Sequence, residues 1–220
     1  MAAWSYSSIK TFDQCPKKYY HLKVARDVKD AQTAAILYGN EVHKAAELNV
    51  KNDTPVPEKF GFITRFIDAL KKLDGEKHCE LKLGVRRAGE NLEPCGFFDR
   101  DVWYRGIVDL LIENGETGYI IDYKTGRNTR YADTKQLDLM AAATFVHYPK
   151  LKELKSALAF VVTNDLIKKI HKREDMLSYM GVFSDELERL AVAHESGVWN
   201  PVSGPLCKFC PVTSCEFNKS

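Results

Sequence analysis

Apolar side chains recur along the chain at two spacings, and their order predicts the secondary structure. From residue 58 to 73 they follow the 3–4 residue period of a helix, whereas residues 118–125 form a short run typical of a strand. Ser184, followed by two acidic residues, marks the start of a helix. We expect helices at 5–21, 33–50, 58–73, 133–148 and 184–195, and strands at 78–86, 102–112, 118–125, 156–163 and 166–172.

This order places helices first, then a small sheet, one helix, and more sheet. It predicts an α/β fold in which helices pack around a compact sheet. The 220 residues suffice for one domain with a sizeable core, so we expect residues 1–220 to form a single domain. The tail from about residue 199 contains two prolines before a cysteine cluster and should be irregular.

Two aspartates interrupt the apolar pattern of the strands at 102–112 and 118–125. The Asn-Gly pair at 114–115 indicates a hairpin turn, and with a loop at 114–117, Glu113 pairs with Gly118 and Asp109 faces Asp122. Facing like charges repel unless a cation lies between them, and Mg²⁺ is commonly bound by one or two carboxylates. Lys124 shares a strand face with Asp122. A surface hairpin with an incidental Asp–Lys ion pair is an equally good reading of these residues alone.

Asp109 together with the run from Asp122 to Gly126, "DYKTG", resembles the core motif of the PD-(D/E)XK nuclease superfamily, most closely its RecB-like branch. The resemblance implies a restriction-endonuclease-like core, a small mixed sheet flanked by helices. It also implies a metal-dependent DNA exonuclease that hydrolyses phosphodiester bonds. Asp109, Asp122 and Lys124 would then be catalytic.

Three further stretches fit that branch. "LYGNEVHKAAE" is similar to its first motif, which implies that His43 is a ligand of Mg²⁺ or Mn²⁺ beside Asp109, Asp122 and the main-chain carbonyl of Tyr123. "QLDLM" carries the family glutamine as Gln136, which implies that Gln136 is also catalytic and helps hold the DNA strand. Met140 stands where relatives often have tyrosine. "CELKLGV" matches the strand before the hairpin, where Glu80 either orients the site or is an exposed strand residue.

Four cysteines are arranged as one distant residue, Cys15, and the triplet Cys207, Cys210 and Cys215. This split resembles the iron–sulfur nucleases of the branch, the AddB-type helicase-nucleases and the RecB-like CRISPR-associated exonucleases. It implies a [4Fe–4S] cluster that joins the termini, with residues 1–30 and 200–220 forming the iron–sulfur region. A structural Zn²⁺ site or free thiols are the alternatives. The two other cysteines, at positions 79 and 95, should be packed as apolar residues.

Composition narrows the setting but not the reaction. The 45% hydrophobic content and the lack of a long apolar run or basic-apolar leader predict a cytoplasmic protein with no membrane partner. The family resemblance implies a bacterial, archaeal or phage-infected cell. No "GxxxxGK[ST]" motif is present, so ATP-driven unwinding is not expected.

The expected partner is DNA, as single strands or duplex ends, with Arg127 and Arg130 near its phosphates. A homo-oligomer, or a protein partner in recombination, repair, phage DNA processing or CRISPR spacer acquisition, fits the same resemblance. Two other functions stay open: a non-catalytic subunit that binds DNA ends, and a zinc-dependent interaction module with an incidental hairpin.

Overall fold

The structure is a computed structural model that describes residues 3–30 and 32–218. The chain separates into two compact units. One comprises Met1–Thr33 and Phe183–Ser220, and the other Ala34–Val182. Both segments expected to form the iron–sulfur region fall within the first unit.

The larger unit, Ala34–Val182, contains one mixed sheet with strand order β2-β1-β3-β4-β5-β6. Only β4 and β5 pair in parallel, and α5 connects them as a crossover. The strands are β1 (Glu76–Ala88), β2 (Asn91–Cys95), β3 (Tyr104–Asn114), β4 (Thr117–Lys124), β5 (Glu153–Phe160) and β6 (Asp165–Lys172). The helices are α3 (Ala34–Asn52), η2 (Glu58–Ile63), α4 (Thr64–Lys71), α5 (Lys135–His147), η3 (Arg173–Asp175) and α6 (Met176–Met180), with η4 (Gly181–Phe183) at the boundary.

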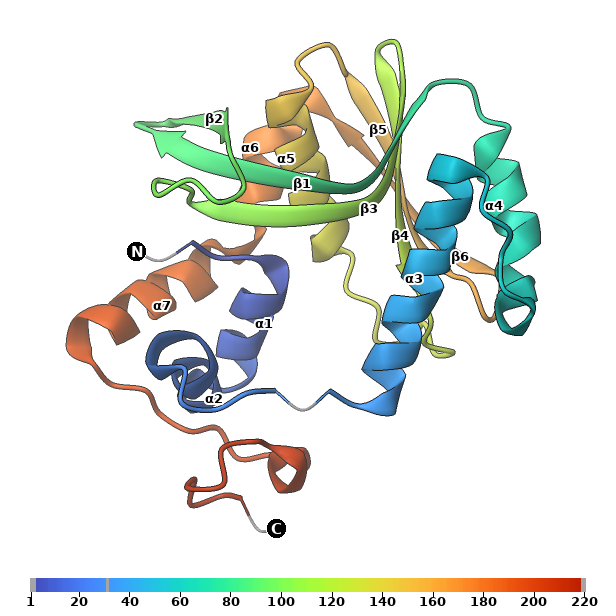
Figure 1. Cartoon of the computed structure of the whole chain (residues 1–220). Helices are drawn as coiled ribbons and strands as arrows, with labels where there is room; N and C mark the ends of the chain where they lie inside the picture. The colour runs from blue at the N-terminus through green and yellow to red at the C-terminus, as the bar shows by residue number, and fades with distance from the viewer. Residues whose placement is uncertain (1–2, 31, 219–220) are drawn as a thin grey trace. The chain divides into compact units, whose positions relative to one another are not determined.

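Helices cover both faces of this sheet (Figure 1). On one face, α3 and α4 pack on alternate residues of β3 and β4, among them Leu110, Ile121 and Tyr123. Asp122 alternates with the last two and points to the opposite face, where Gln136 of α5 contacts it. The α/β expectation of helices around a small mixed sheet is confirmed.

The hairpin has the expected register with a shorter turn. Glu113 pairs with Gly118, and Asn114 pairs with Thr117, so only Gly115 and Glu116 form the loop. Gly115 has φ +63°, a left-handed conformation that glycine adopts without steric cost. The next positions along this register bring Asp109 opposite Asp122.

One strand and one α-helix were not predicted. β2 contains Pro94, which has no N–H group to donate to a strand ladder, so the sequence did not indicate a strand here. A proline is tolerated because β2 lies at the edge of the sheet. The five residues of α6 are too few to show a helical period. The expected helix at 5–21 is interrupted at Cys15, because a residue before proline is disfavoured in the helical region, and its backbone is extended there (φ −164°, ψ 106°).

The smaller unit holds α1 (Tyr6–Gln14), α2 (Pro16–Tyr19), η1 (Tyr20–Ala25), α7 (Ser184–Ser196) and η5 (Cys207–Phe209). A capping box between Ser5 and Ser8 begins α1. Trp199 stacks on Tyr19 with ring centroids 5.9 Å apart. These contacts bring the N-terminal helices against the C-terminal segment within this unit.

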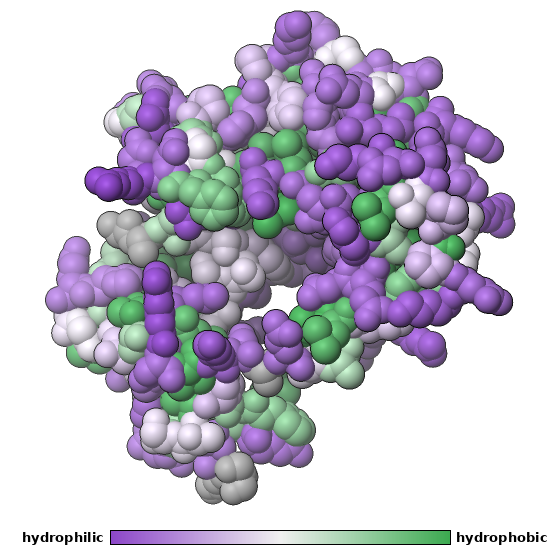
Figure 2. All heavy atoms as spheres, viewed as in Figure 1, coloured by the Kyte–Doolittle hydropathy of each residue, from purple (hydrophilic) through white to green (hydrophobic). Residues whose placement is uncertain are grey.

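Hydrophilic side chains cover most of the visible face of the larger unit, and hydrophobic ones form small separate groups (Figure 2). In the described part of the chain, no helix has both the length and the apolarity to cross a bilayer.

Candidate active site

The site lies where β3 and β4 stop pairing. Their ladder ends at Leu110 and Ile121, one position before Asp109 and Asp122. The carboxylate of Asp109 replaces the missing strand partner, because its Oδ2 accepts the main-chain N–H of Tyr123 at 2.8 Å. The opening therefore keeps the backbone satisfied and leaves two carboxylates beside each other between the strands.

A chain of polar contacts links β4 to α5. Gln136 donates through Nε2 to Asp122 Oδ1 at 2.8 Å and accepts from Lys124 Nζ at 2.9 Å through its own Oε1. Lys124 Nζ also lies 2.5 Å from Asp122 Oδ2. The amide of Gln136 thus fixes the directions of both charged groups, and the predicted common face of Asp122 and Lys124 is confirmed.

A second group adjoins the first from α3 and β1. Ligand atoms of His43, Glu80 and Asp109 lie within 4.8 Å of one another, with His43 Nδ1 3.3 Å from Asp109 Oδ2. Glu80 lies opposite Asp109 in the register of β1 and β3, but these two residues do not pair, although the residues on either side of them do. Glu80 has φ +50°, an uncommon left-handed conformation for a residue with a side chain.

The carboxylate of Glu80 lies in the same cluster as Asp109, so Glu80 is not an isolated strand residue. Backbone strain of this kind concentrates at functional sites. Only the resemblance of "CELKLGV" pointed to Glu80, and nothing in the strand pattern indicated its left-handed backbone.

Charge is concentrated in a poorly solvated space. Burial, and next the negative charge of Asp109, raise the pKa of Asp122 from 3.8 to about 6, despite the opposing effect of Lys124. Burial and Asp109 also raise the pKa of Glu80. Burial alone would lower the pKa of His43, but its contact with Asp109 and the nearby carboxylates outweigh burial and raise it. The cluster therefore carries excess negative charge that a cation would relieve.

The remaining predicted contacts lie in or beyond the loop after Lys124. Arg127 and Arg130 are exposed in the segment between β4 and α5. Met140 is 5% exposed and lies within α5, one turn after Gln136. Its apolar side chain contributes packing, and no polar group takes the place of the family tyrosine there.

The four predicted cluster cysteines line one cavity of about 370 Å³ in the smaller unit. Cys15 Sγ accepts the N–H groups of Lys18 and Val202, each at 3.5 Å, and Cys207 Sγ accepts that of Gly204 at 3.3 Å. Among the described residues, no three cysteine sulfur atoms lie within 4.8 Å of one another. The four cysteines therefore share a cavity without forming a close cluster of sulfur atoms.

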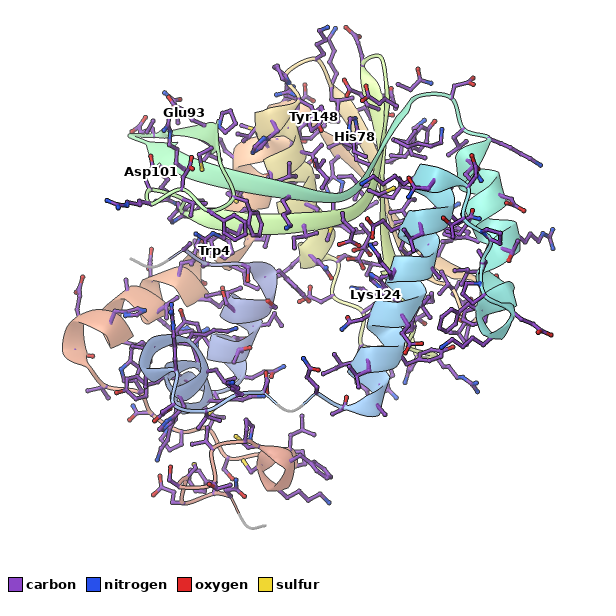
Figure 3. All side chains as sticks on the ribbon, viewed as in Figure 1. Trp4, His78, Glu93, Asp101, Lys124 and Tyr148 are labelled. Atoms are coloured by element: carbon purple, nitrogen blue, oxygen red, sulfur yellow. The ribbon has the colours of Figure 1, made fainter. Side chains whose placement is uncertain are left out.

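One other group of ligand atoms was not predicted. Glu76, His78 and Glu113 have ligand atoms within 4.8 Å of one another. They lie at the hairpin end of β1 and β3, and Figure 3 shows His78 beside Tyr148, at the other end of the sheet from Lys124. This group is therefore separate from the candidate active site.

The arrangement of Asp109, Asp122, Glu80 and His43 suits a divalent cation of the Mg²⁺ or Mn²⁺ class. Carboxylate oxygens are hard ligands, and an imidazole favours Mn²⁺ over Mg²⁺. Asp122 is 3% exposed, and Gln136 and Lys124 hold its carboxylate beside this cluster. Lys124 is 32% exposed and reaches the surface beside this cluster.

Comparisons with known proteins bear on the fold and on the family of this chain. No curated protein matches the chain. A solved structure of a protein from Eubacterium rectale named "Putative exonuclease" matches with a TM-score of 0.51 and 13% identity, covering 99% of this chain and 87% of its own. The crystal structure of SSO0001 matches with a TM-score of 0.44 and 12% identity, covering 100% and 89% respectively.

The similarity to the Eubacterium rectale structure shows a shared fold. A comparison with a family model shows a similarity in sequence as well. The family model of the PD-(D/E)XK nuclease superfamily matches residues 3–215, nearly the whole chain. This chain belongs to the PD-(D/E)XK nuclease superfamily.

Proposed function

We propose that the protein is a metal-dependent DNA exonuclease of the RecB-like branch. The proposal depends on one observation: two groups of polar residues lie side by side where β3 and β4 stop pairing. One is the ligand cluster of His43, Glu80 and Asp109, and the other is the Asp122–Gln136–Lys124 chain. A non-catalytic relative has no need to retain both groups in contact.

The proposed cation ligands are His43, Asp109, Asp122 and the Tyr123 carbonyl, and we add Glu80 to the set. Their fit is supported by the raised pKa values of Asp122 and Glu80, which burial raises first and the negative charge of Asp109 raises next. A bound divalent cation supplies charge that stabilises the transition state and acidifies water.

The chain's own residues then orient the reaction. Asp109 holds the Tyr123 amide and so keeps the two strands apart. Lys124 offers an ammonium group to the scissile phosphate or to the attacking water, and its contacts with Gln136 and Asp122 hold that group in place. Water attacks phosphorus, the bond to the leaving oxygen breaks, and that oxygen takes up a proton. Arg127 and Arg130 extend the positive charge toward neighbouring phosphates.

A [4Fe–4S] cluster is the proposed occupant of the cysteine cavity. Each cysteine binds a different iron, so the sulfur atoms stand farther apart than the ligands of a single zinc ion. The N–H groups directed at the sulfur atoms of Cys15 and Cys207 support the proposal, since such hydrogen bonds stabilise cluster ligands. The expected role is structural, joining the two chain segments of the smaller unit.

The cluster is tested by colour and iron content. Protein purified without oxygen should be brown, and Cys215→Ser should lose colour and iron, whereas Cys95→Ser should keep both. A colourless wild type that contains zinc would overturn the cluster proposal.

The nuclease is tested on end-labelled linear DNA, single- and double-stranded, with Mn²⁺, Mg²⁺ or EDTA. We expect metal-dependent loss of nucleotides from an end, absent in Lys124→Ala and retained in Lys152→Ala, whose lysine is 69% exposed outside the site. Equal cleavage by wild type and Lys124→Ala would refute the site assignment. DNA-end binding without cleavage would favour an accessory role. Recombination, repair, phage DNA processing and CRISPR spacer acquisition are the settings that such an activity fits.

A further inference from the structure

One face of β3 leads directly away from the candidate active site. Asp109, Ile107 and Arg105 alternate along the strand and therefore share this face. On β1, Lys82 pairs with Ile107 and Gly84 pairs with Arg105, so these residues widen the same strip. From Asp109 to Arg105 the strip is roughly 13 Å long, at about 3.3 Å per residue.

A loop lies across the far part of the strip. A Cβ atom on Gly84 would stand 2.8 Å from the carbonyl oxygens of both Cys95 and Gly96, so the loop backbone rests on this glycine. Asp99 fixes the loop by accepting the N–H of Gly96 at 2.7 Å. The loop thereby presents Phe97 and Phe98 beside the strip.

Two cations lie under these rings. Lys82 Nζ is 5.7 Å from the ring centroid of Phe98 and 5.9 Å from that of Phe97, and Arg105 Cζ is 5.7 Å from the ring of Phe97. Within residues 3–30 and 32–218, neither cation pairs with a carboxylate. Arg105 Nε is moreover buried without a hydrogen-bond partner.

The next cation along β1 has a different environment. Arg86 lies 3.0 Å from Glu93 and 3.2 Å from Asp101. Figure 3 shows these two acidic residues near the end of β1 that is far from Lys124. Acidic residues therefore neutralise the positive charge at the far end of β1. Positive charge without a carboxylate partner remains on the part of the strip that adjoins Asp109.

The strip combines the two groups that a single nucleic-acid strand requires. Phosphates need cations without carboxylate partners, and bases stack on exposed aromatic rings. Phe98 is 77% exposed, more than any other phenylalanine among the exposed hydrophobic residues, although burial of a phenylalanine side chain is favourable by about 1.5–3 kcal/mol. An apolar protein partner would explain the ring but not the unpaired cations beneath it.

We propose that this strip is the binding platform for the single-stranded end of the DNA substrate. Phe98 stacks on a base, and Lys82 and Arg105 contact phosphates of the strand that enters the active site at Asp109. At an axial rise of about 3.4 Å per nucleotide of a stacked strand, the strip spans about four nucleotides. The platform rests on the proposed nuclease function and names the form of substrate that the site takes.

The first test measures binding of a fluorescent oligothymidylate by anisotropy, with EDTA present to prevent cleavage. Phe98→Ala should weaken binding at least about fivefold, the lower limit for one stacked base. The salt dependence of binding by Phe98→Ala should match that of wild type. Lys82→Gln should instead reduce the slope of the logarithm of the binding constant against the logarithm of the salt concentration by about 0.7. Ile170→Ala (60% exposed) and Lys155→Gln, whose lysine also lies 5.8 Å from an aromatic ring, are the matched controls.

The second test separates the platform from the active site. A small chromogenic phosphodiester occupies the catalytic centre alone, so wild type and Phe98→Ala should cleave it equally with Mn²⁺. Cleavage of the oligonucleotide at limiting concentration should fall in Phe98→Ala. If wild type cleaves neither substrate, the proposed nuclease function fails, whereas if both proteins cleave the oligonucleotide equally, only the platform is wrong.

Abasic substitutions identify the stacked base. One abasic nucleotide, moved along the four positions nearest the labelled end, should weaken wild-type binding at one position by as much as Phe98→Ala does. At that position the abasic oligonucleotide should bind the variant no more weakly than the intact one does. Additive losses at every position would overturn the stacking contact.

Discussion

The ionised carboxylate of Asp122 should destabilise the folded protein when no cation is bound. The side chain is 3% exposed, and its pKa is raised from 3.8 to about 6, first by burial and then by Asp109. Because the folded-state pKa is the higher one, the folded state favours the protonated acid. The resulting stabilisation is present below pH 3.8 and is lost as the pH rises through about 6.

The size of the effect follows from the two pKa values. Ionised Asp122 costs the folded state about 3 kcal/mol at pH 7 relative to a neutral group, and about 0.5 kcal/mol at pH 4. Asp122→Asn retains an oxygen that can accept from Gln136 and carries no charge. We therefore expect this variant to be more stable than wild type by about 3 kcal/mol at pH 7, or roughly 6–12 °C in Tm, and to lack nuclease activity.

The assay is urea unfolding in EDTA at pH 7 and pH 4, with wild type, Asp122→Asn and the control Asp68→Asn. Asp68 is an exposed residue of α4, and its variant should match wild type at both pH values. A stability gain for Asp122→Asn that is equal at pH 4 and pH 7, or no gain at pH 7, would refute the electrostatic account of the site.

Three further variants test separate contacts. His171 is fully buried and hydrogen-bonds to Asp138 at 2.8 Å and Ser156 at 3.1 Å, so His171→Ala should destabilise the protein by at least about 1–3 kcal/mol in urea unfolding, and an unchanged stability would contradict these contacts. Gly84→Ala should cost about 1–3 kcal/mol, because its Cβ meets loop carbonyl oxygens at 2.8 Å; an unchanged Tm would show that the loop moves freely. Gln136→Leu should lower kcat about 10²-fold or more through the loss of its hold on Lys124, with stability checked in parallel; an unchanged kcat would remove Gln136 from the site.

The hairpin and its two aspartates were the most predictable part of the molecule. The Asn-Gly turn signal and the alternating strand pattern defined the register, and the register placed Asp109 opposite Asp122. Gln136 and Lys124 followed from the motif spacing, and their contact bears out the expected proximity. These residues lie close in sequence or on paired strands, where local rules suffice.

Other features depended on distant contacts that no local pattern records. Glu80 joins the site because its left-handed backbone and its place opposite Asp109 arise only when β1 pairs with β3. The loop with Phe97 and Phe98 comes to lie on Gly84 for the same reason, after a β2 strand that Pro94 conceals. The cysteine spacing indicated a cluster, but the shared cavity of Cys15 and the C-terminal triplet required the folded chain.

The central claim, that the parting of β3 and β4 holds a metal-dependent exonuclease centre, is tested most directly by one substrate in two forms. The same single-stranded DNA is supplied as a closed circle and as a linear strand, with Mn²⁺, to wild type and to Asp109→Asn. The account predicts that wild type shortens the linear strand from an end and spares the circle, and that Asp109→Asn leaves both intact. Equal cleavage of circle and linear strand, or undiminished digestion by Asp109→Asn, would contradict it.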